Sequence, residues 1–165
     1  MGWLSDLWNR FKPSNGTEEL SFESLRTLED MVGYRFQETG LLIKALKHRS
    51  YVYAKQGSGI ESNERLEFLG DRVLGLVVAD MLLAEFPSED EGALGYRFAA
   101  LARRETLERI ADAIGFEPFI RRELDPNEIS ARQKSGLLAN ACEAVIGAIY
   151  LDGGFTRAHE FIRSH

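Results

Sequence analysis

Three carboxylates lie close together in one predicted helix: Glu64, Glu67 and Asp71. At about 100° per residue, steps of three and seven positions return to within about 60° of the starting direction, so the three share one side. The surrounding positions are largely apolar, and acids in so apolar a helix are costly unless a cation compensates them. A divalent metal ion is the natural compensator, because hard cations take oxygen ligands. On spacing alone, a solvated helix face with ion pairs to Arg65 or Arg72 remains the alternative.

A second polar pair, Asn140 and Glu143, lies three positions apart in the apolar segment 137–150. One such helix could be chance, but two in a small domain indicate partners that face one another around a metal ion. Glycine costs about 1 kcal/mol relative to alanine inside a helix. We therefore interpret Gly70 and Gly147 as points where another helix approaches closely.

The composition is that of a globular chain with one domain: 165 residues, 44% hydrophobic and 28% charged. The net charge of -6 argues on its own against a nucleic-acid partner, although a bound metal would neutralise some of the carboxylates. The single cysteine, Cys142, excludes an internal disulfide and is expected to be a small buried side chain rather than a nucleophile. No apolar run approaches the roughly 20 residues that span a bilayer, and no secretory signal is present. We therefore expect a cytoplasmic protein without a membrane partner.

Helical periodicity dominates the chain, and no stretch alternates with the period of two that marks a half-buried strand. The sequence therefore predicts an all-α fold. Ser62 or Asn63 is the expected N-cap of the acid-bearing helix. The polar segment 121–136 is expected to be a mobile connector. The predicted helices span residues 22–32, 39–47, 62–85, 92–114, 137–151 and 155–165.

The first 20 residues form a separate unit in this interpretation. Apolar residues from Trp3 to Phe11 recur with the spacing of an amphipathic helix, and a turn or short linker follows at 13–17. This helix could pack on its own domain or on a second copy of the chain, or it could lie on a membrane surface. The main domain is then 21–165, and its last helix ends without a stop signal, which is consistent with truncation of a longer natural chain.

Two groups of basic residues leave their roles open. The segment 48–51, His-Arg-Ser-Tyr, could compensate the dipole at a helix end or contact a phosphate. A basic stripe on the predicted helix 92–114 could be a charged surface or could contact a nucleic-acid backbone. Its members are Arg97, Arg103, Arg104 and Arg109.

The segment from Asn63 to Asp71, N-E-R-L-E-F-L-G-D, resembles the signature of the ribonuclease III family. Further family-like segments occur in the same order as in the family, and the resemblance covers about 25–163. These segments are 32–36, 45–51, 90–92, 143–148 and 150–154.

The resemblance implies an all-helical endonuclease domain over 21–165 that dimerises and hydrolyses double-stranded RNA. Mg²⁺ is the implied cofactor, with Mn²⁺ as a substitute, and each protomer would cut one strand during rRNA and mRNA processing. Asp71 and Glu143 would be catalytic, and Glu64 and Glu91 would complete an acidic valley for the substrate. The implied metal ligands are Glu67, Asp71, Asn140 and Glu143.

Three positions depart from the family pattern: Asn140 stands where Asp is common, Lys47 replaces a common Thr, and Phe98 replaces a common Arg. The usual C-terminal RNA-binding domain is absent from these 165 residues. The alternative to an enzyme is a non-catalytic relative that binds duplex RNA or dimerises as a scaffold. The retained acids favour the enzyme, because degenerate members lose signature acids.

Overall fold

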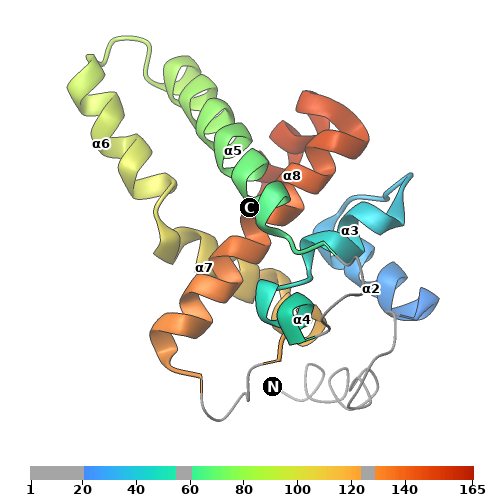
Figure 1. The fold of residues 1–165 in the computed structure, drawn as a ribbon. Helices are drawn as coiled ribbons and strands as arrows, with labels where there is room; N and C mark the ends of the chain where they lie inside the picture. The colour runs from blue at the N-terminus through green and yellow to red at the C-terminus, as the bar shows by residue number, and fades with distance from the viewer. Residues whose placement is uncertain (1–20, 55–60, 124–128) are drawn as a thin grey trace, which may run out of the picture.

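The computed structural model describes residues 21–54, 61–123 and 129–165, and within these ranges it contains helices and no strand (Figure 1). This confirms the all-α prediction. The N-terminal helix and linker predicted for 1–20 lie outside the described residues. In chain order the elements are α2 (Phe22–Val32), α3 (Thr39–Ala45), α4 (Arg49–Ala54), α5 (Glu64–Glu85), α6 (Glu91–Leu101), α7 (Arg104–Ile114), the 3-10 turn η1 (Glu117–Phe119) and α8 (Ala131–Ser164).

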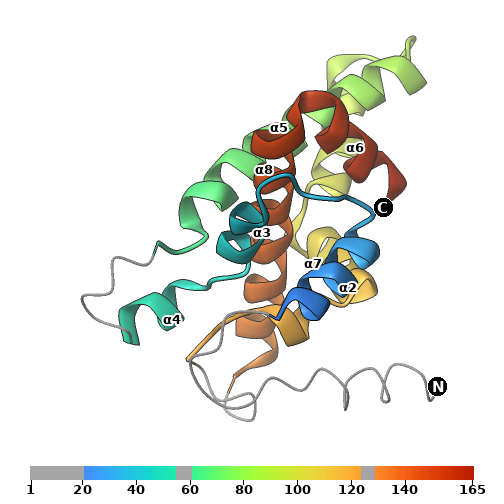
Figure 2. The ribbon, with the colours of Figure 1, turned by 90° about the vertical axis from the view of Figure 1, so that its right-hand side faces the viewer.

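Helix α8 runs through the centre of the fold, with α5, α7 and α3 packed around it (Figure 2). Its middle, Leu137 to Ile149, is apolar on nearly every side and almost wholly buried. A helix that is hydrophobic all round must be enclosed, which explains its central place. Cys142 is fully buried here, and burial raises the pKa of its thiol to about 12, so the predicted structural role fits better than a nucleophilic one.

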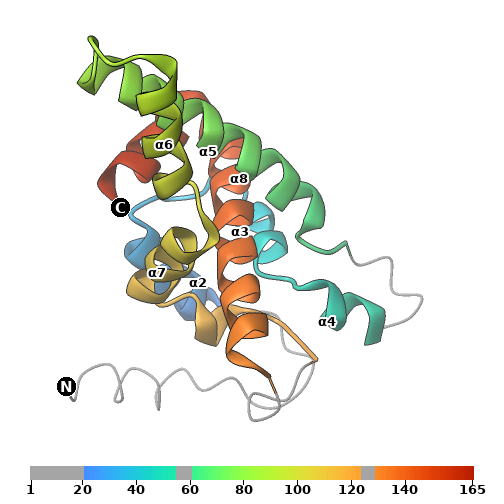
Figure 3. The ribbon, with the colours of Figure 1, turned by 90° about the vertical axis from the view of Figure 1, so that its left-hand side faces the viewer.

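The predicted single helix over 92–114 is wrong, because the chain breaks between α6 and α7. Arg103 is extended, with φ -74° and ψ 155°. The Thr106 hydroxyl donates a hydrogen bond of 3.0 Å to the Ala100 carbonyl, which would otherwise lose its helical partner. The break lets α6 pack on α5 while α7 turns onto α8 (Figure 3). No glycine or proline marks it, so helical periodicity continues across it in the sequence.

The connector predicted over 121–136 is also partly wrong, because α8 already begins at Ala131. A capping box starts it: the Ser130 hydroxyl accepts from the Gln133 backbone N–H, and the Gln133 side chain accepts from the Ser130 N–H at 2.9 Å. The predicted boundary before the last helix corresponds to a kink at Gly154, whose φ is 78°. The predicted helix 39–47 ends earlier, at Ala45, and the short helix α4 was not predicted.

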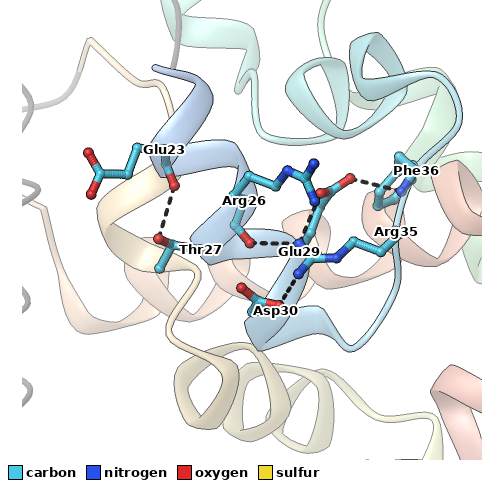
Figure 4. A network of polar contacts seen from close by, with 7 residues as sticks. All are labelled: Glu23, Arg26, Thr27, Glu29, Asp30, Arg35 and Phe36. Atoms are coloured by element: carbon cyan, nitrogen blue, oxygen red, sulfur yellow. Dashed lines mark hydrogen bonds and ion pairs between the residues drawn. The ribbon is translucent and has the colours of Figure 1, made fainter.

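A buried carboxylate fixes the turn between α2 and α3 (Figure 4). Glu29 is 5% exposed, and its carboxylate accepts from the Phe36 backbone N–H at 2.8 Å and from the Arg35 guanidinium at 3.2 Å. Arg35 also donates to the Arg26 carbonyl oxygen at 3.1 Å and pairs with Asp30. The hydrogen bonds to a backbone amide and a cation satisfy a charge that would otherwise be costly to bury.

Asp152 on α8 joins this turn to the core. Its carboxylate accepts from the Tyr34 hydroxyl at 2.8 Å and from the backbone N–H groups of Gln37 and Glu38 at 2.9 and 2.8 Å. Burial alone would raise the pKa of Asp152, but these hydrogen bonds hold it below its ordinary value. Two segments far apart in the sequence, 32–38 and 150–154, are thereby locked together.

Candidate active site

Five of the six acidic-site residues named from the sequence line a single pocket of about 390 Å³ between α5 and α8. The sixth, Glu91, does not. It begins α6 at the far end of α5, and the 14 residue steps from Asp71 to Glu85 alone span about 21 Å of helix. The pocket is lined by His48, Arg49, Asn63, Glu64, Glu67, Phe68, Asp71, Asn140 and Glu143.

Two glycines allow the helices to cross at this point. A Cβ on Gly70 would lie 1.7 Å from the Glu143 carbonyl oxygen, and a Cβ on Gly147 would lie 2.3 Å from the Leu66 carbonyl oxygen. No larger residue fits at either position without moving a backbone. The predicted close helix approach is therefore confirmed. Because Gly70 is next to Asp71, the crossing itself brings the acids of α5 against the polar pair of α8.

Asn63 fixes the start of α5 at the mouth of the pocket. It is 2% exposed, its side-chain amide donates to the Ala45 carbonyl at 3.2 Å, and its backbone N–H donates to the Lys47 carbonyl at 2.8 Å. Asn63 occupies the N-cap position, but its side chain makes no capping hydrogen bond. Instead of capping α5, the Asn63 side chain hydrogen-bonds to the end of α3. The local sequence cannot reveal this long-range contact.

The carboxylates raise one another's proton affinity. Burial, followed by the charges of Asp71 and Glu67, raises the pKa of Glu143 to about 7. Burial and the charge of Glu64 likewise raise the pKa of Glu67. Like charges held together in a partly dry pocket destabilise the ionised state, and a bound cation would reverse this. Arg104 acts in the opposite direction on both Glu67 and Glu143, lowering their pKa values.

Four side chains of the pocket offer oxygen atoms that suit a hard dication: three carboxylates and one amide. They are Glu67, Asp71, Glu143 and Asn140. Within the described residues, no three His, Cys, Asp or Glu side chains are already grouped tightly enough to hold an ion together. Asp71 is paired with Arg72, which also lies over the Phe68 ring at 5.1 Å. If Asp71 bound a metal ion, its ion pair with Arg72 would have to break.

His48 and Arg49 form the other wall of the pocket. The His48 Nδ1 accepts from the Ser50 backbone N–H at 3.2 Å, at the start of α4, so it does not compensate the end of the preceding helix. Burial, followed by the charge of Arg49, lowers the pKa of His48, which leaves the imidazole neutral near pH 7. Arg49 is the cation here, with Nη1 4.0 Å from Glu64 Oε1.

The predicted basic stripe is divided by the break between α6 and α7. Arg97 makes two hydrogen bonds of 2.7 Å to Glu89 and lies 3.8 Å from the Phe86 ring centroid, at the end of α5 away from the pocket. Phe98 packs at the edge of the core, 3.6 Å from the Cβ position of Gly75. Neither residue lines the acidic pocket.

Several known proteins are similar to this chain. A family model described as Ribonuclease-III-like matches residues 38–165. The chain is 46% identical to Ribonuclease 3 of Geobacter metallireducens over 133 residues and 43% identical to Ribonuclease 3 of Bradyrhizobium diazoefficiens over 136 residues. These matches cover 80% and 82% of this chain and 54% of each relative, so the chain spans about half the length of the curated relatives it matches.

A solved structure of the nuclease domain of ribonuclease III from Campylobacter jejuni superposes with a TM-score of 0.76 at 36% identity. The superposition covers 85% of this chain and 94% of that one, and that study concerns flexibility in a region involved in dimer formation. The chain therefore belongs to the ribonuclease III family, and its described helices have the fold of the family's nuclease domain.

Proposed function

We propose that this protein is an Mg²⁺-dependent endoribonuclease that hydrolyses double-stranded RNA, with Mn²⁺ as an alternative ion and precursor rRNA and mRNA as substrates. The observation that carries this proposal is the meeting of two acid-bearing helices in one pocket. That meeting gives four oxygen-donor side chains a common place to bind a dication. They are Glu67, Asp71, Asn140 and Glu143.

A dication bound here supplies Lewis-acid chemistry, since it lowers the pKa of water and neutralises charge on a phosphate. Glu67 and Glu143 come from facing helices, so they can hold the ion from two sides. The pKa of Glu143, raised to about 7, means that this carboxylate is partly protonated near neutral pH and releases its proton as the ion binds, and the raised pKa of Glu67 acts in the same direction. Asn140 can offer a carbonyl oxygen without charge. Arg49, 4.0 Å from Glu64, provides a cation for a phosphate at the edge of the pocket.

A homodimer is part of this proposal. Large apolar side chains are exposed along α5 and α6, including Leu76 at 60%, Leu83 at 63% and Tyr96 at 82%. An apolar surface of this kind commonly marks a protein interface. A two-fold axis crossing the middle of α5 would bring Glu91 of the second protomer towards the Glu64 end of this pocket. Glu91 could complete the acidic valley in that way, although it cannot within one protomer.

The test is an assay of end-labelled duplex RNA, with the same single strand and the corresponding duplex DNA as controls. We expect cleavage of the duplex RNA in Mg²⁺, none after chelation, and recovery on adding Mg²⁺ or Mn²⁺. Binding of duplex RNA without cleavage in either ion would support the non-catalytic alternative and reject the enzyme.

A further inference from the structure

Arg104 is the first residue of α7, but its side chain reaches across to α8. Its Nη1 lies 3.6 Å from the point where a Cβ would stand on Gly136. Gly136 precedes Asn140 by four positions and Glu143 by seven, so all three share one face of α8. The guanidinium therefore lies over the helix face that carries the metal-ligand pair, one turn before Asn140.

This guanidinium is available to a ligand. Arg104 is exposed, and within residues 21–54, 61–123 and 129–165 no carboxylate lies within 4.0 Å of it. Its charge nevertheless reaches the acids on both helices, because it lowers the pKa values of Glu67 and Glu143. Arg104 is thus near the carboxylates without being neutralised by any one of them.

Arg104 does not stabilise α7. It follows Arg103 at the amino end of the helix, where the helix dipole is positive and cations are disfavoured. Arg103, the N-cap residue, makes no side-chain capping bond either. A local preference broken in this way at the edge of a pocket is expected where function, rather than folding, selects the residue.

A second arginine lies on the other side of the same acids. Arg49 belongs to α4, and α4 and α7 lie on opposite sides of α8 (Figure 3). Arg49 lies 4.0 Å from Glu64 on α5 and Arg104 lies over Gly136 on α8, so the carboxylates lie between two cations supplied by different helices. An RNA strand crossing the pocket would meet positive charge before and after the acids.

We propose that Arg104 is a substrate-positioning residue that binds an RNA backbone phosphate on the α7 side of the acidic pocket. With Arg49 on the α4 side, it would hold the strand so that the phosphodiester between them lies over Glu67, Asp71 and Glu143. Arginine suits this task because its planar guanidinium can make two hydrogen bonds to one phosphate. A backbone contact also agrees with recognition of duplex RNA by shape rather than by base sequence. This inference rests on the proposed function.

The experiment compares Arg104→Gln with Arg109→Gln in the full chain. Arg109 is exposed on the same helix, about 140° further round, and gives an equal change in net charge. Affinity for a fluorescent RNA duplex is measured by anisotropy over a range of salt concentrations, and the RNA is checked by gel after each titration. We expect about tenfold weaker binding for Arg104→Gln, with a salt slope about 0.7 to 0.9 smaller, and little change for Arg109→Gln.

Two further measurements separate positioning from folding. Arg104→Lys should restore the salt slope but only part of the affinity, because lysine keeps the charge without the paired hydrogen bonds. The melting temperature of Arg104→Gln should equal or slightly exceed that of the unmodified protein, since a cation leaves the positive end of α7. Equal RNA affinity in the Arg104→Gln and Arg109→Gln variants, or a lower melting temperature for Arg104→Gln, would overturn the inference. Failure of the unmodified protein to cleave duplex RNA would instead reject the proposed function.

Discussion

Replacing Gly70 by alanine should both destabilise the fold and open the proposed active site. The added Cβ would lie 1.7 Å from the Glu143 carbonyl oxygen and 2.9 Å from the Gly147 nitrogen, whereas real Cβ atoms essentially never come closer than 3.0 Å. The helices must therefore separate by at least about 1.3 Å, because the obstructing atoms are backbone and cannot rotate away. Overpacking typically costs about 1–3 kcal/mol, and the better helix propensity of alanine returns at most about 1 kcal/mol.

We expect a net loss of about 1–2 kcal/mol, which for a chain of this size lowers the melting temperature by roughly 2–8 °C. Catalysis should fall further, since a displacement of about 1 Å between reacting groups costs on the order of 100-fold in rate. Thermal unfolding and cleavage of duplex RNA below the melting temperature measure the two effects separately.

The matched control is Gly75→Ala, in the same helix. Its Cβ would lie 3.6 Å from the Phe98 ring, which is an ordinary contact. This variant should be neutral or up to about 1 kcal/mol more stable, with normal activity. A Gly70→Ala protein that melts and cleaves like the unmodified one would refute the claim that the contact between α5 and α8 sets the site geometry.

Four further predictions concern charge and assembly. Asn140→Asp should lower the Mg²⁺ concentration needed for half-maximal rate, because it adds a negative charge beside Glu143. If a Mg²⁺ titration shows an unchanged or higher requirement, Asn140 does not contact the ion directly. Burial and neighbouring carboxylates raise the pKa of Glu143 to about 7, so protons should compete with the metal ion below that pH. The Mg²⁺ concentration for half-maximal rate should then rise up to about tenfold for each unit by which the pH falls. A requirement that stays constant between pH 5 and 7 in kinetic measurements would contradict this. The chelated protein should correspondingly lose stability as the pH rises from about 4.5 to 7, since the folded state then binds more protons than the unfolded state. The protein should sediment as a dimer at micromolar concentration. The Leu76→Glu variant should sediment as a folded monomer, because it places a charge on the exposed apolar surface of α5. An unmodified protein that sediments as a monomer would exclude the proposed assembly.

The sequence predicted those parts of the site that depend on helical spacing. A helical period of 3.6 residues placed Glu64, Glu67 and Asp71 on one face of their helix and Asn140 and Glu143 on one face of theirs, and these five side chains line one pocket. Each set is local to one helix, so no tertiary information was needed to place them on a common face. The close helix approach at Gly70 was predicted from the cost of glycine inside a helix.

Features that depend on tertiary contacts could not be predicted in this way. The break before α7 has no glycine or proline, and it exists because α6 and α7 pack on different helices. Arg104 reaches Gly136 only because the chain breaks before α7. The sequence predicted one continuous basic stripe on a single helix, so it could not predict this position of Arg104. Glu91 lies beyond the pocket because α6 begins at the opposite end of α5. The capping box at Ser130, by contrast, was present in the sequence and marked the start of α8.

The central claim is that the α5–α8 pocket holds the ion that drives hydrolysis, and Glu143→Gln tests it most directly. Glutamine keeps the shape of the side chain but removes its charge from the metal site. Cleavage of labelled duplex RNA in Mg²⁺ and binding of the same duplex should be measured on one preparation of each protein. Our account predicts that cleavage falls by orders of magnitude while RNA affinity stays within a fewfold of normal. Near-normal cleavage by Glu143→Gln in Mg²⁺ would contradict it.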